Sequence, residues 1–279
     1  MEILRYSAFS AAPGGGNPAG VVLDATGLAE SEMLAAAAEI GYSETAFVVP
    51  AGDRVLDIRY FSPLVEVPFC GHATIATAVA YAQRHGVGPL DLRTKAGPVS
   101  VSTTSAADGA VVATLVSVPP RVEPIGDDDL ATLLRALRWS VDDLDPALPP
   151  RAAYAGAWHP VIAAADRERL ARLDYDMPAL AELMARRDWA TVDLVWRESP
   201  TVFHSRNPFP PGGVVEDPAT GAAAAAFGGY LRELGLMPTP GEIVVHQGHD
   251  MGRPSRIDVS VPAGAGSGIA VTGSAVLLP

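Results

Sequence analysis

Two stretches of sequence determine what can be expected of this chain, GHATIATAVAY at residues 71–81 and TGAAAAAFGGY at residues 220–230. Each is a run of small, apolar or hydroxylic residues that ends in a tyrosine, and each follows a short loop with a proline, Pro68 or Pro218. A helix without a polar face is buried on all sides. The pair therefore predicts two homologous halves, each with a sheet wrapped around one central helix.

Around these stretches the pattern is mainly that of strands. The boundary between the halves is predicted at residues 119–124, where strand signals stop and three aspartates at 127–129 open an amphipathic helix. A further helix is predicted over 28–40, with Gly41 as its C-cap. Strands are expected at residues 3–10, 19–23, 45–49, 55–61, 161–165, 191–196, 243–246, 257–261 and 269–278.

The composition excludes several classes of function. The chain has 279 residues, of which 48% are hydrophobic and 19% charged, so it can bury a large core. Its net charge of −12 argues against nucleic acid as a partner, because phosphate binding needs a basic surface. The apolar stretches fall short of the roughly 20 residues that a bilayer crossing takes. The first residues do not resemble a signal peptide, and we therefore expect a cytoplasmic enzyme.

No cofactor is expected. The only lysine, Lys95, lies in a predicted turn, which disfavours Schiff-base chemistry. The only cysteine, Cys70, excludes cysteine-rich metal sites and internal disulfides, and the six histidines contain no His-Glu-x-x-His pair. Glycines at 14 and 16 have dinucleotide-binding spacing, but Pro18 and a β-branched run follow them instead of a helix.

The chemistry is expected at the starts of the two apolar helices. Helix N-termini present backbone N–H groups and a partial positive charge, which can hold an anion in a chain without a basic surface. Two ionisable side chains, His72 and Asp217, lie at these helix starts, and a third, Glu44, lies between the predicted helix at 28–40 and an apolar strand. Each has a structural alternative: Asp217 suits a helix N-cap, His72 a hydrogen-bonded first-turn residue, and Glu44 a carboxylate held by backbone donors.

Several short motifs together resemble one family, the PhzF-like proteins, over residues 9–255. They are Gly16-Asn17-Pro18, Ser43-Glu44-Thr45-Ala46-Phe47-Val48, Pro68-Phe69-Cys70-Gly71-His72-Ala73-Thr74, Glu216-Asp217-Pro218-Ala219-Thr220-Gly221, and Gln247-Gly248 with Met251-Gly252-Arg253-Pro254-Ser255. The resemblance implies an α/β (α+β) fold like that of diaminopimelate epimerase, with two pseudo-symmetric domains and an active site between them. Residues 1–118 with 268–279 would form one domain, and residues 119–267 the other.

The resemblance also implies an activity. The phenazine-pathway enzyme of this family isomerises trans-2,3-dihydro-3-hydroxyanthranilate without cofactor or metal, as a homodimer. By motif, Glu44 is similar to its general acid/base, while His72 and Asp217 are similar to residues that orient the substrate and assist proton movement. The residues implied in binding the small carboxylate substrate are Asn17, Ser43, Gly71, Thr220, Gly221 and Ala222.

Departures from the family pattern leave two other readings open. Cys70 stands where two-cysteine racemases of this fold have their first thiol, but no second cysteine exists. An epimerase using Cys70 alone, or with Glu44, is thus one alternative, and a catalytically silent small-molecule-binding protein is the other. Ala222 replaces a common serine, and Arg206 is either a ligand for an acidic substrate or an ion-paired residue.

Overall fold

The first apolar stretch forms helix α2 (Gly71–His85), which is buried along almost its whole length. The computed structural model describes residues 1–279. The chain divides into two units, Met1–Val116 with Thr272–Pro279, and Ser117–Val271. None of the helices combines the length and the apolarity that a membrane crossing requires.

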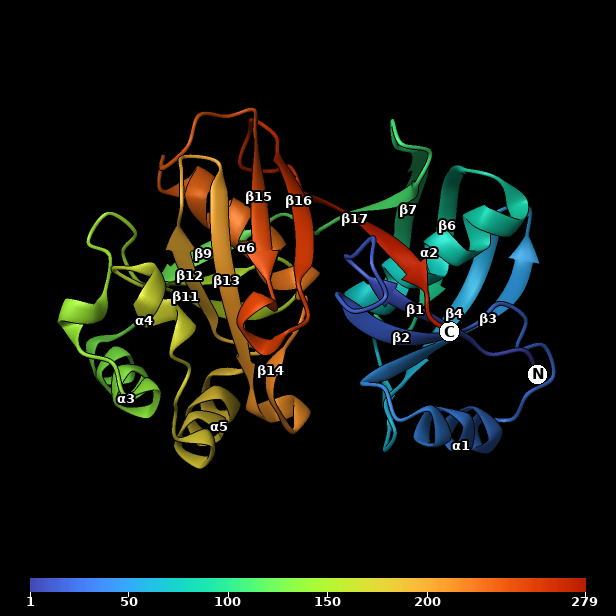
Figure 1. Ribbon diagram of the computed structural model, residues 1–279, viewed down its shortest axis with the longest axis horizontal. Coiled ribbons are helices and arrows are strands. Elements are labelled where there is room, and N and C mark those ends of the chain that lie inside the picture. Colours follow the sequence, from blue (N-terminus) through green and yellow to red (C-terminus); the bar gives the residue numbers. More distant parts are fainter. The chain divides into compact units, whose positions relative to one another are not determined.

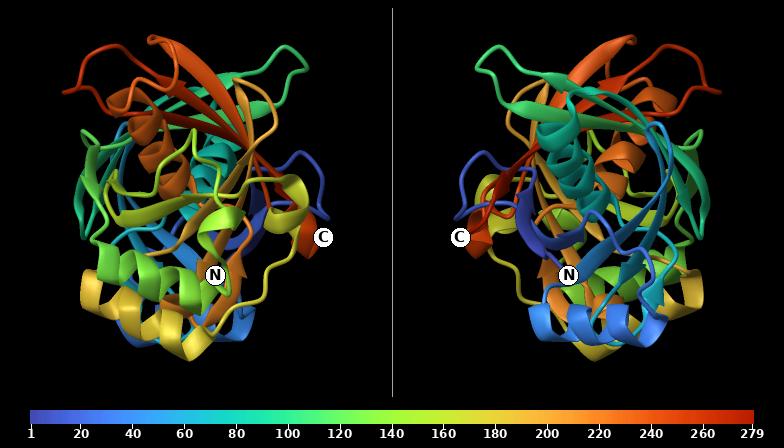
Figure 2. Two further views of the ribbon diagram at one scale, coloured as in Figure 1. Left: turned by 90° about the vertical axis from the view of Figure 1, so that its left-hand side faces the viewer. Right: turned by 90° about the vertical axis from the view of Figure 1, so that its right-hand side faces the viewer.

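In the first unit a closed ring of strands surrounds α2, as the right-hand view of Figure 2 shows. The order around the ring is β1, β2, β3, β4, β6, β7, β8 and β17, and β17 pairs again with β1. The bounds are β1 Leu4–Ala8, β2 Asn17–Val22, β3 Glu44–Gly52, β4 Val55–Phe61, β6 Gly88–Thr94, β7 Gly97–Ser105, β8 Val111–Val116 and β17 Ala270–Leu277, with a short β5 (Glu66–Val67) beside β4. Helix α2 packs against β1, β2, β3, β7 and β8, and its residues from His72 to Ala80 are all buried, which explains why this part of the helix has no polar face.

Helix α1 (Glu30–Ile40) covers the outside of β3 and β4, below them in Figure 1. Its buried residues Met33, Ala36 and Ala37 pack against Phe47 and Phe61. It ends at Gly41, whose φ of 72° is the left-handed conformation of a helix C-cap. The predicted helix and its cap are confirmed.

The second unit repeats this plan around α6 (Gly221–Glu233). The strands are β9 Arg121–Pro124, β10 Arg151–Tyr154, β11 Trp158–Ala163, β12 Asp193–Arg197, β13 Val202–Phe209, β14 Val214–Asp217, β15 Gly241–Gln247 and β16 Ser255–Val261. The helices on the outside are α3 Asp127–Leu137, α4 Arg167–Ala171 and α5 Met177–Arg187, with short 3₁₀ turns η1 Val141–Asp143, η2 Pro210–Gly212 and η3 His249–Met251. Leu133, Leu137, Leu180 and Met184 belong to the apolar core between α3, α5 and the sheet.

The order of strand pairing is the same in both units. In the first, β1–β2 is antiparallel, β2–β3 parallel, β3–β4 antiparallel and β4–β6 parallel. In the second, β10–β11, β11–β12, β12–β13 and β13–β15 follow the same sequence of directions. The fold class, a mixed α/β chain with a curled sheet around a central helix in each half, is confirmed.

Helix α6 begins where the stretch at residues 220–230 predicts. It starts at Gly221, with Thr220 as the N-cap and Pro218 in the preceding loop. The carbonyl oxygen of Pro218 accepts a hydrogen bond from Ser255 Oγ at 2.9 Å, and the Thr220 N–H donates to Gln247 Oε1 at 2.9 Å. These contacts hold the loop before α6 in place, because they give its backbone groups partners on other segments of the chain.

Candidate active site

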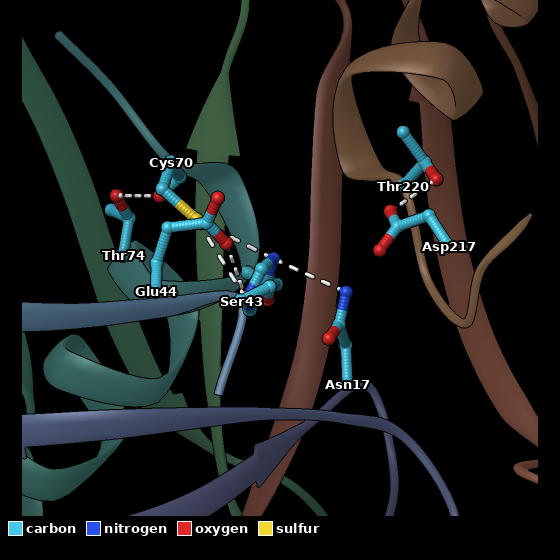
Figure 3. Close-up of polar contacts among 8 residues, drawn as sticks. Asn17, Ser43, Glu44, Cys70, Thr74, Asp217 and Thr220 are labelled. Carbon is cyan, nitrogen blue, oxygen red and sulfur yellow. Dashed lines mark hydrogen bonds and ion pairs between the residues drawn. The ribbon is translucent and has the colours of Figure 1, made fainter. Parts of the chain in front are cut away.

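Glu44, Cys70 and His72 converge in the first unit. Glu44 is the first residue of β3, Cys70 is the N-cap of α2 and His72 lies in the first turn of that helix. Glu44 Oε2 lies 3.4 Å from His72 Nε2 and 3.5 Å from Cys70 Sγ, and Cys70 Sγ lies 3.4 Å from His72 Nδ1. The Glu44 side chain is 17% exposed, so its carboxylate sits at the edge of the core and not inside it. Figure 3 shows the labelled Glu44 and Cys70 side chains pointing toward one another.

Asn17 and Ser43 orient the His72 ring. The Asn17 side-chain amide lies 3.2 Å from His72 Nδ1, and Ser43 Oγ lies 3.4 Å from His72 Nε2. With the Asn17 amide nitrogen as the donor, Nδ1 accepts and the ring hydrogen belongs on Nε2. That hydrogen faces the Glu44 carboxylate. The structure thus brings five of the sequence-predicted site residues into one group, and their catalytic roles stay a prediction.

The backbone at the start of α2 is held by buried hydroxyls. Thr74 Oγ1 donates to the Cys70 carbonyl oxygen at 2.7 Å, and Tyr60 Oη lies 2.6 Å from Thr74 Oγ1. Burial raises the pKa of Tyr60, which keeps its phenol protonated as a donor. At Gly71 the space is open: a Cβ there would meet no protein atom within 4 Å. No packing within this chain therefore requires a glycine at the first residue of α2, whereas a ligand approaching its backbone would.

Asp217 and Thr220 form a second group, in the other unit. Asp217 ends β14, and its Oδ2 accepts a hydrogen bond from Thr220 Oγ1 at 2.5 Å. Thr220, not Asp217, occupies the N-cap position of α6, so the N-cap alternative for Asp217 is wrong. The next two predicted residues, Gly221 and Ala222, form the half-buried first turn of α6.

Gln247 holds this second group, a role that the sequence motif did not reveal. Its amide nitrogen donates to the Asp217 carbonyl oxygen at 2.7 Å and to Thr220 Oγ1 at 3.0 Å, while its Oε1 accepts from the Thr220 N–H. Gly248 follows with a φ of +74°, and a Cβ there would lie 2.2 Å from the Arg253 carbonyl oxygen and 2.7 Å from that of Pro218. Only glycine fits so close to two carbonyl groups.

Arg206 is not available for an acidic substrate. Its guanidinium makes a buried, two-bond ion pair with Glu216, the Nε to Oε2 distance being 2.9 Å, and donates to the Ala171 carbonyl oxygen at 2.6 Å. The ion-paired alternative is therefore the one observed. The pair ties β13 to β14, and so supports the strand that carries Asp217.

A buried polar network lies inside the second unit, at a place that the sequence did not single out. Asp193 Oδ1 accepts from Ser205 Oγ at 2.6 Å and from the Asn207 amide at 3.1 Å. Thr191 Oγ1 donates to Asn207 Oδ1 at 2.6 Å and lies 2.8 Å from His159 Nδ1. Burial raises the pKa of Asp193 to about 6 and lowers the pKa of His159 to about 4, because neither charged form is solvated there.

One group of side chains has the composition of a metal site. Glu44, Cys70 and His72 each offer one ligand atom, and these atoms lie within 4.8 Å of one another. The sequence predicts no metal ligands, since the three residues do not have the spacing of a known metal motif. Their convergence depends on the placement of β3 beside the start of α2.

Comparisons with known proteins show which sequences and folds this chain resembles. The model of one family, described as phenazine biosynthesis-like protein (PhzC-PhzF), matches residues 6–279. The chain is 31% identical over 288 residues to an uncharacterised isomerase of Bacillus subtilis (strain 168), covering 99% of this chain and 96% of that protein. It is 34% identical over 254 residues to the trans-2,3-dihydro-3-hydroxyanthranilate isomerase of Pseudomonas chlororaphis, covering 89% and 86%. The crystal structure of a Bacillus anthracis phenazine biosynthesis protein of the PhzF family superposes with a TM-score of 0.89 at 26% identity, covering 100% of this chain and 98% of that one.

Proposed function

This chain belongs to the phenazine biosynthesis-like family, and on that premise we propose that it is an isomerase that moves a proton within a small carboxylate substrate, without a cofactor, with Glu44 as general acid and base. The observation that carries the proposal is the group formed by Glu44, Cys70 and His72 at the start of α2. An acid that can be reached from solvent but is fixed by side-chain partners is what proton transfer requires.

The two oxygens of Glu44 differ in their surroundings. The contacts to His72 and Cys70 all fall on Oε2, and none of them involves Oε1. Donors on Oε2 fix the plane of the carboxylate and leave Oε1 able to take a proton from a carbon atom. The same oxygen then returns the proton to another carbon, so one carboxylate serves both half-steps of an isomerisation.

The substrate carboxylate is proposed to bind at backbone N–H groups of the central helices. In the first unit, the open space at Gly71 supports this role, and Asn17 and Ser43 hold the His72 ring in place beside it. In the second unit, the proposal assigns substrate contacts to Asp217 and to the start of α6. The residues proposed there besides Asp217 are Thr220, Gly221 and Ala222.

The first substrate to test is trans-2,3-dihydro-3-hydroxyanthranilate. It is the substrate named for the Pseudomonas chlororaphis relative, which is 34% identical to this chain. The wild-type protein is incubated with it in deuterated buffer, and products and deuterium content are followed by absorbance and NMR. We expect isomerisation by the wild type and none above background by Glu44→Gln.

The matched control is Glu39→Gln, which changes an exposed carboxylate on α1 in the same unit. This variant is expected to retain wild-type turnover. If the wild type does not isomerise this compound, the compound is not its substrate, and hydrogen–deuterium exchange in a panel of small amino and hydroxy acids then tests proton transfer on other carboxylates. Equal activity of Glu44→Gln and the wild type would refute the role of Glu44.

A second candidate is an epimerase in which Cys70 and Glu44 work as a mixed pair. The 3.5 Å contact between Cys70 Sγ and Glu44 Oε2 favours it, because a thiol so placed can share the proton of the acid. Cys70→Ser separates the two candidates. Turnover close to that of the wild type supports an isomerase that uses Glu44 alone, and loss of turnover with an intact fold supports the pair.

Three further parts of the proposal can be checked directly. Absence of a cofactor predicts that activity survives dialysis against a chelator. The implied homodimer predicts twice the chain mass in sedimentation. A cytoplasmic location predicts that the protein fractionates with cytoplasmic markers in the cells that express it.

A further inference from the structure

We propose that Glu44, Cys70 and His72 form a binding site for a thiophilic divalent ion such as Zn²⁺, and that the bound ion blocks proton transfer by Glu44. The site uses the side chains of the proposed acid–base centre: the binding of the ion rests on their geometry alone, and the block of proton transfer rests on the proposed function. The carboxylate, the thiol and the imidazole each offer one ligand atom, and these three atoms lie within 4.8 Å of one another.

The distances between the three ligand atoms are close to those between three of the four ligands of a tetrahedral zinc ion. They are 3.5 Å from Cys70 Sγ to Glu44 Oε2, 3.4 Å from Glu44 Oε2 to His72 Nε2 and 3.8 Å from Cys70 Sγ to His72 Nε2. Bond lengths of about 2.3 Å to sulfur and about 2.0–2.2 Å to nitrogen and oxygen place the ligands of tetrahedral zinc about 3.4–3.6 Å apart. The side chains therefore need to move by only a few tenths of an ångström, and the fourth position is left for water.

The ligand set selects the kind of ion. Thiolate and imidazole favour Zn²⁺ and Co²⁺, whereas Mg²⁺ and Ca²⁺ prefer oxygen ligands alone. On binding, the Cys70 thiol loses its proton to solvent and the sulfur donates an electron pair to the metal; no electron is transferred between them. The Glu44 carboxylate then donates its electron pair to the ion and cannot act as a base.

Asn17 makes His72 a suitable ligand. Binding through Nε2 requires the ring hydrogen to move to Nδ1, where a metal-bound histidine commonly donates it to a carbonyl group or a carboxylate. The Asn17 side chain lies 3.2 Å from Nδ1, and a half-turn of its amide presents the carbonyl oxygen in place of the nitrogen. Asn17, which orients the His72 ring, would thus also accept the Nδ1 hydrogen of a metal-bound His72.

A histidine cluster in the second unit is the competing site. His204, His246 and His249 have ring centroids 5.3–5.9 Å apart, and His204 Nε2 lies 2.6 Å from Glu198 Oε2. These rings would bind the same ions without a thiolate. Any test of the proposed site must therefore report the sulfur ligand itself.

Co²⁺ titration provides that report, because a cobalt–thiolate bond has a near-ultraviolet charge-transfer band and Cys70 is the only cysteine in the chain. We expect the wild type to develop this band, Zn²⁺ to abolish it by displacement, and Mg²⁺ to leave it unchanged. Cys70→Ser should lack the band. His72→Ala and Glu44→Gln should bind Co²⁺ at least about tenfold more weakly, as for the loss of a metal-site residue.

The matched control is the double variant His246→Ala/His249→Ala, which should keep the band and its midpoint. Circular dichroism checks that each variant is folded, and Glu44→Gln, which preserves side-chain shape, stands in if His72→Ala does not fold. No band in the folded wild type overturns the proposal, as does a band of undiminished affinity in Glu44→Gln and the folded His72 variant. Because the readout is a spectrum, an inactive but metal-binding protein separates this inference from the proposed isomerase activity.

Discussion

Glu44 and Asp193 occupy the same position in the two halves of the molecule and have opposite environments. Each is the first residue of a strand that runs parallel to the preceding one, with Glu44 opposite Ala19 and Asp193 opposite Val161. The Glu44 side chain is 17% exposed, whereas Asp193 is 2% exposed and accepts hydrogen bonds from Ser205 and Asn207. The comparison shows that a repeated fold supplies carboxylates at equivalent positions, and that burial decides which of them can meet a substrate.

The loops that lead into the two central helices differ in the same way. Before α2, the loop ends at Cys70 and Gly71, with open space at the glycine. Before α6, the side chain of Gln247 binds Asp217 and Thr220, and Gly248 lies against the Pro218 carbonyl group. Thr74 of α2 itself bonds to the loop before that helix, with Tyr60 of β4 behind it, whereas the loop before α6 is bonded directly by Gln247 of β15.

The largest expected effect contrasts the two carboxylates directly. Glu44→Gln should lower turnover about 10²- to 10⁴-fold, as for the loss of a general acid/base, while the free energy of unfolding changes little. Asp193→Asn should leave turnover close to that of the wild type and change the unfolding free energy instead, because Asp193 is a buried acceptor. Steady-state kinetics and urea denaturation of both variants measure this contrast. Loss of turnover in both would mean that the two positions are functionally alike.

The second contrast concerns the two glycines. Gly248→Ala should destabilise the protein by about 1–3 kcal/mol from the positive φ alone, and further because of the two nearby carbonyl oxygens. Gly71→Ala should change the stability by no more than about 1 kcal/mol, since its Cβ enters open space, but should raise KM for a carboxylate substrate. Thermal denaturation and kinetics test the pair. An unaltered KM in Gly71→Ala would contradict ligand contact at this residue.

The buried network of the second unit predicts two opposing pH dependences. The pKa of Asp193 is raised to about 6, so this group stabilises the folded state at low pH and loses that contribution as the pH rises from about 4 to 6. The pKa of His159 is lowered to about 4, so its contribution is present above about pH 6.5 and is lost as the pH falls to 4. Each amounts to about 2–3 kcal/mol at most.

Single variants separate these contributions. Relative to the wild type, the unfolding free energy of His159→Gln should rise as the pH falls from 6 to 4, because the loss caused by His159 is removed. Relative to the wild type, that of Asp193→Asn should fall over the same range, because the gain from Asp193 is removed. Urea denaturation at a series of pH values measures both slopes relative to the wild type. Parallel slopes in the two variants would show that the network does not titrate as described.

The smallest effects come from the contacts that hold the two helix entries. Gln247→Ala should cost about 1–3 kcal/mol, since it leaves the Thr220 N–H and the Asp217 carbonyl group without their partner. Tyr60→Phe should cost only about 1 kcal/mol, because Thr74 keeps its bond to the Cys70 carbonyl oxygen. Thermal denaturation of the two variants ranks them. A larger cost for Tyr60→Phe would reverse the stated difference between the loops.

Much of the fold can be read from local sequence. The absence of a polar face identifies α2 and α6 as central helices, and Gly41 marks the end of α1, because both signals depend on residues close together in the chain. The contacts that hold the loop before α6 are not predictable in this way. Ser255 and Gln247, which form hydrogen bonds with Pro218 and Thr220, lie 37 and 27 residues from these partners in the sequence.

The candidate site shows the same limit. Glu44, Cys70 and His72 are each recognisable as chemically capable residues, but their separations of 3.4–3.8 Å arise only when β3 is placed beside the start of α2. Arg206 is ambiguous in the sequence, and its buried partner Glu216 becomes evident only when β13 pairs with β14. Contacts between side chains distant in sequence carry no local signal.

The sequence by itself determined that this chain has two buried helices in two similar halves, and which few residues could perform acid–base chemistry with a single cysteine and a single lysine. Only the tertiary structure decided which carboxylate is reachable, which is buried, and which side chains touch. The reason is physical: helix burial follows from the composition of one contiguous segment, whereas the state of Glu44 or Asp193 depends on solvent access and on partners supplied by other strands.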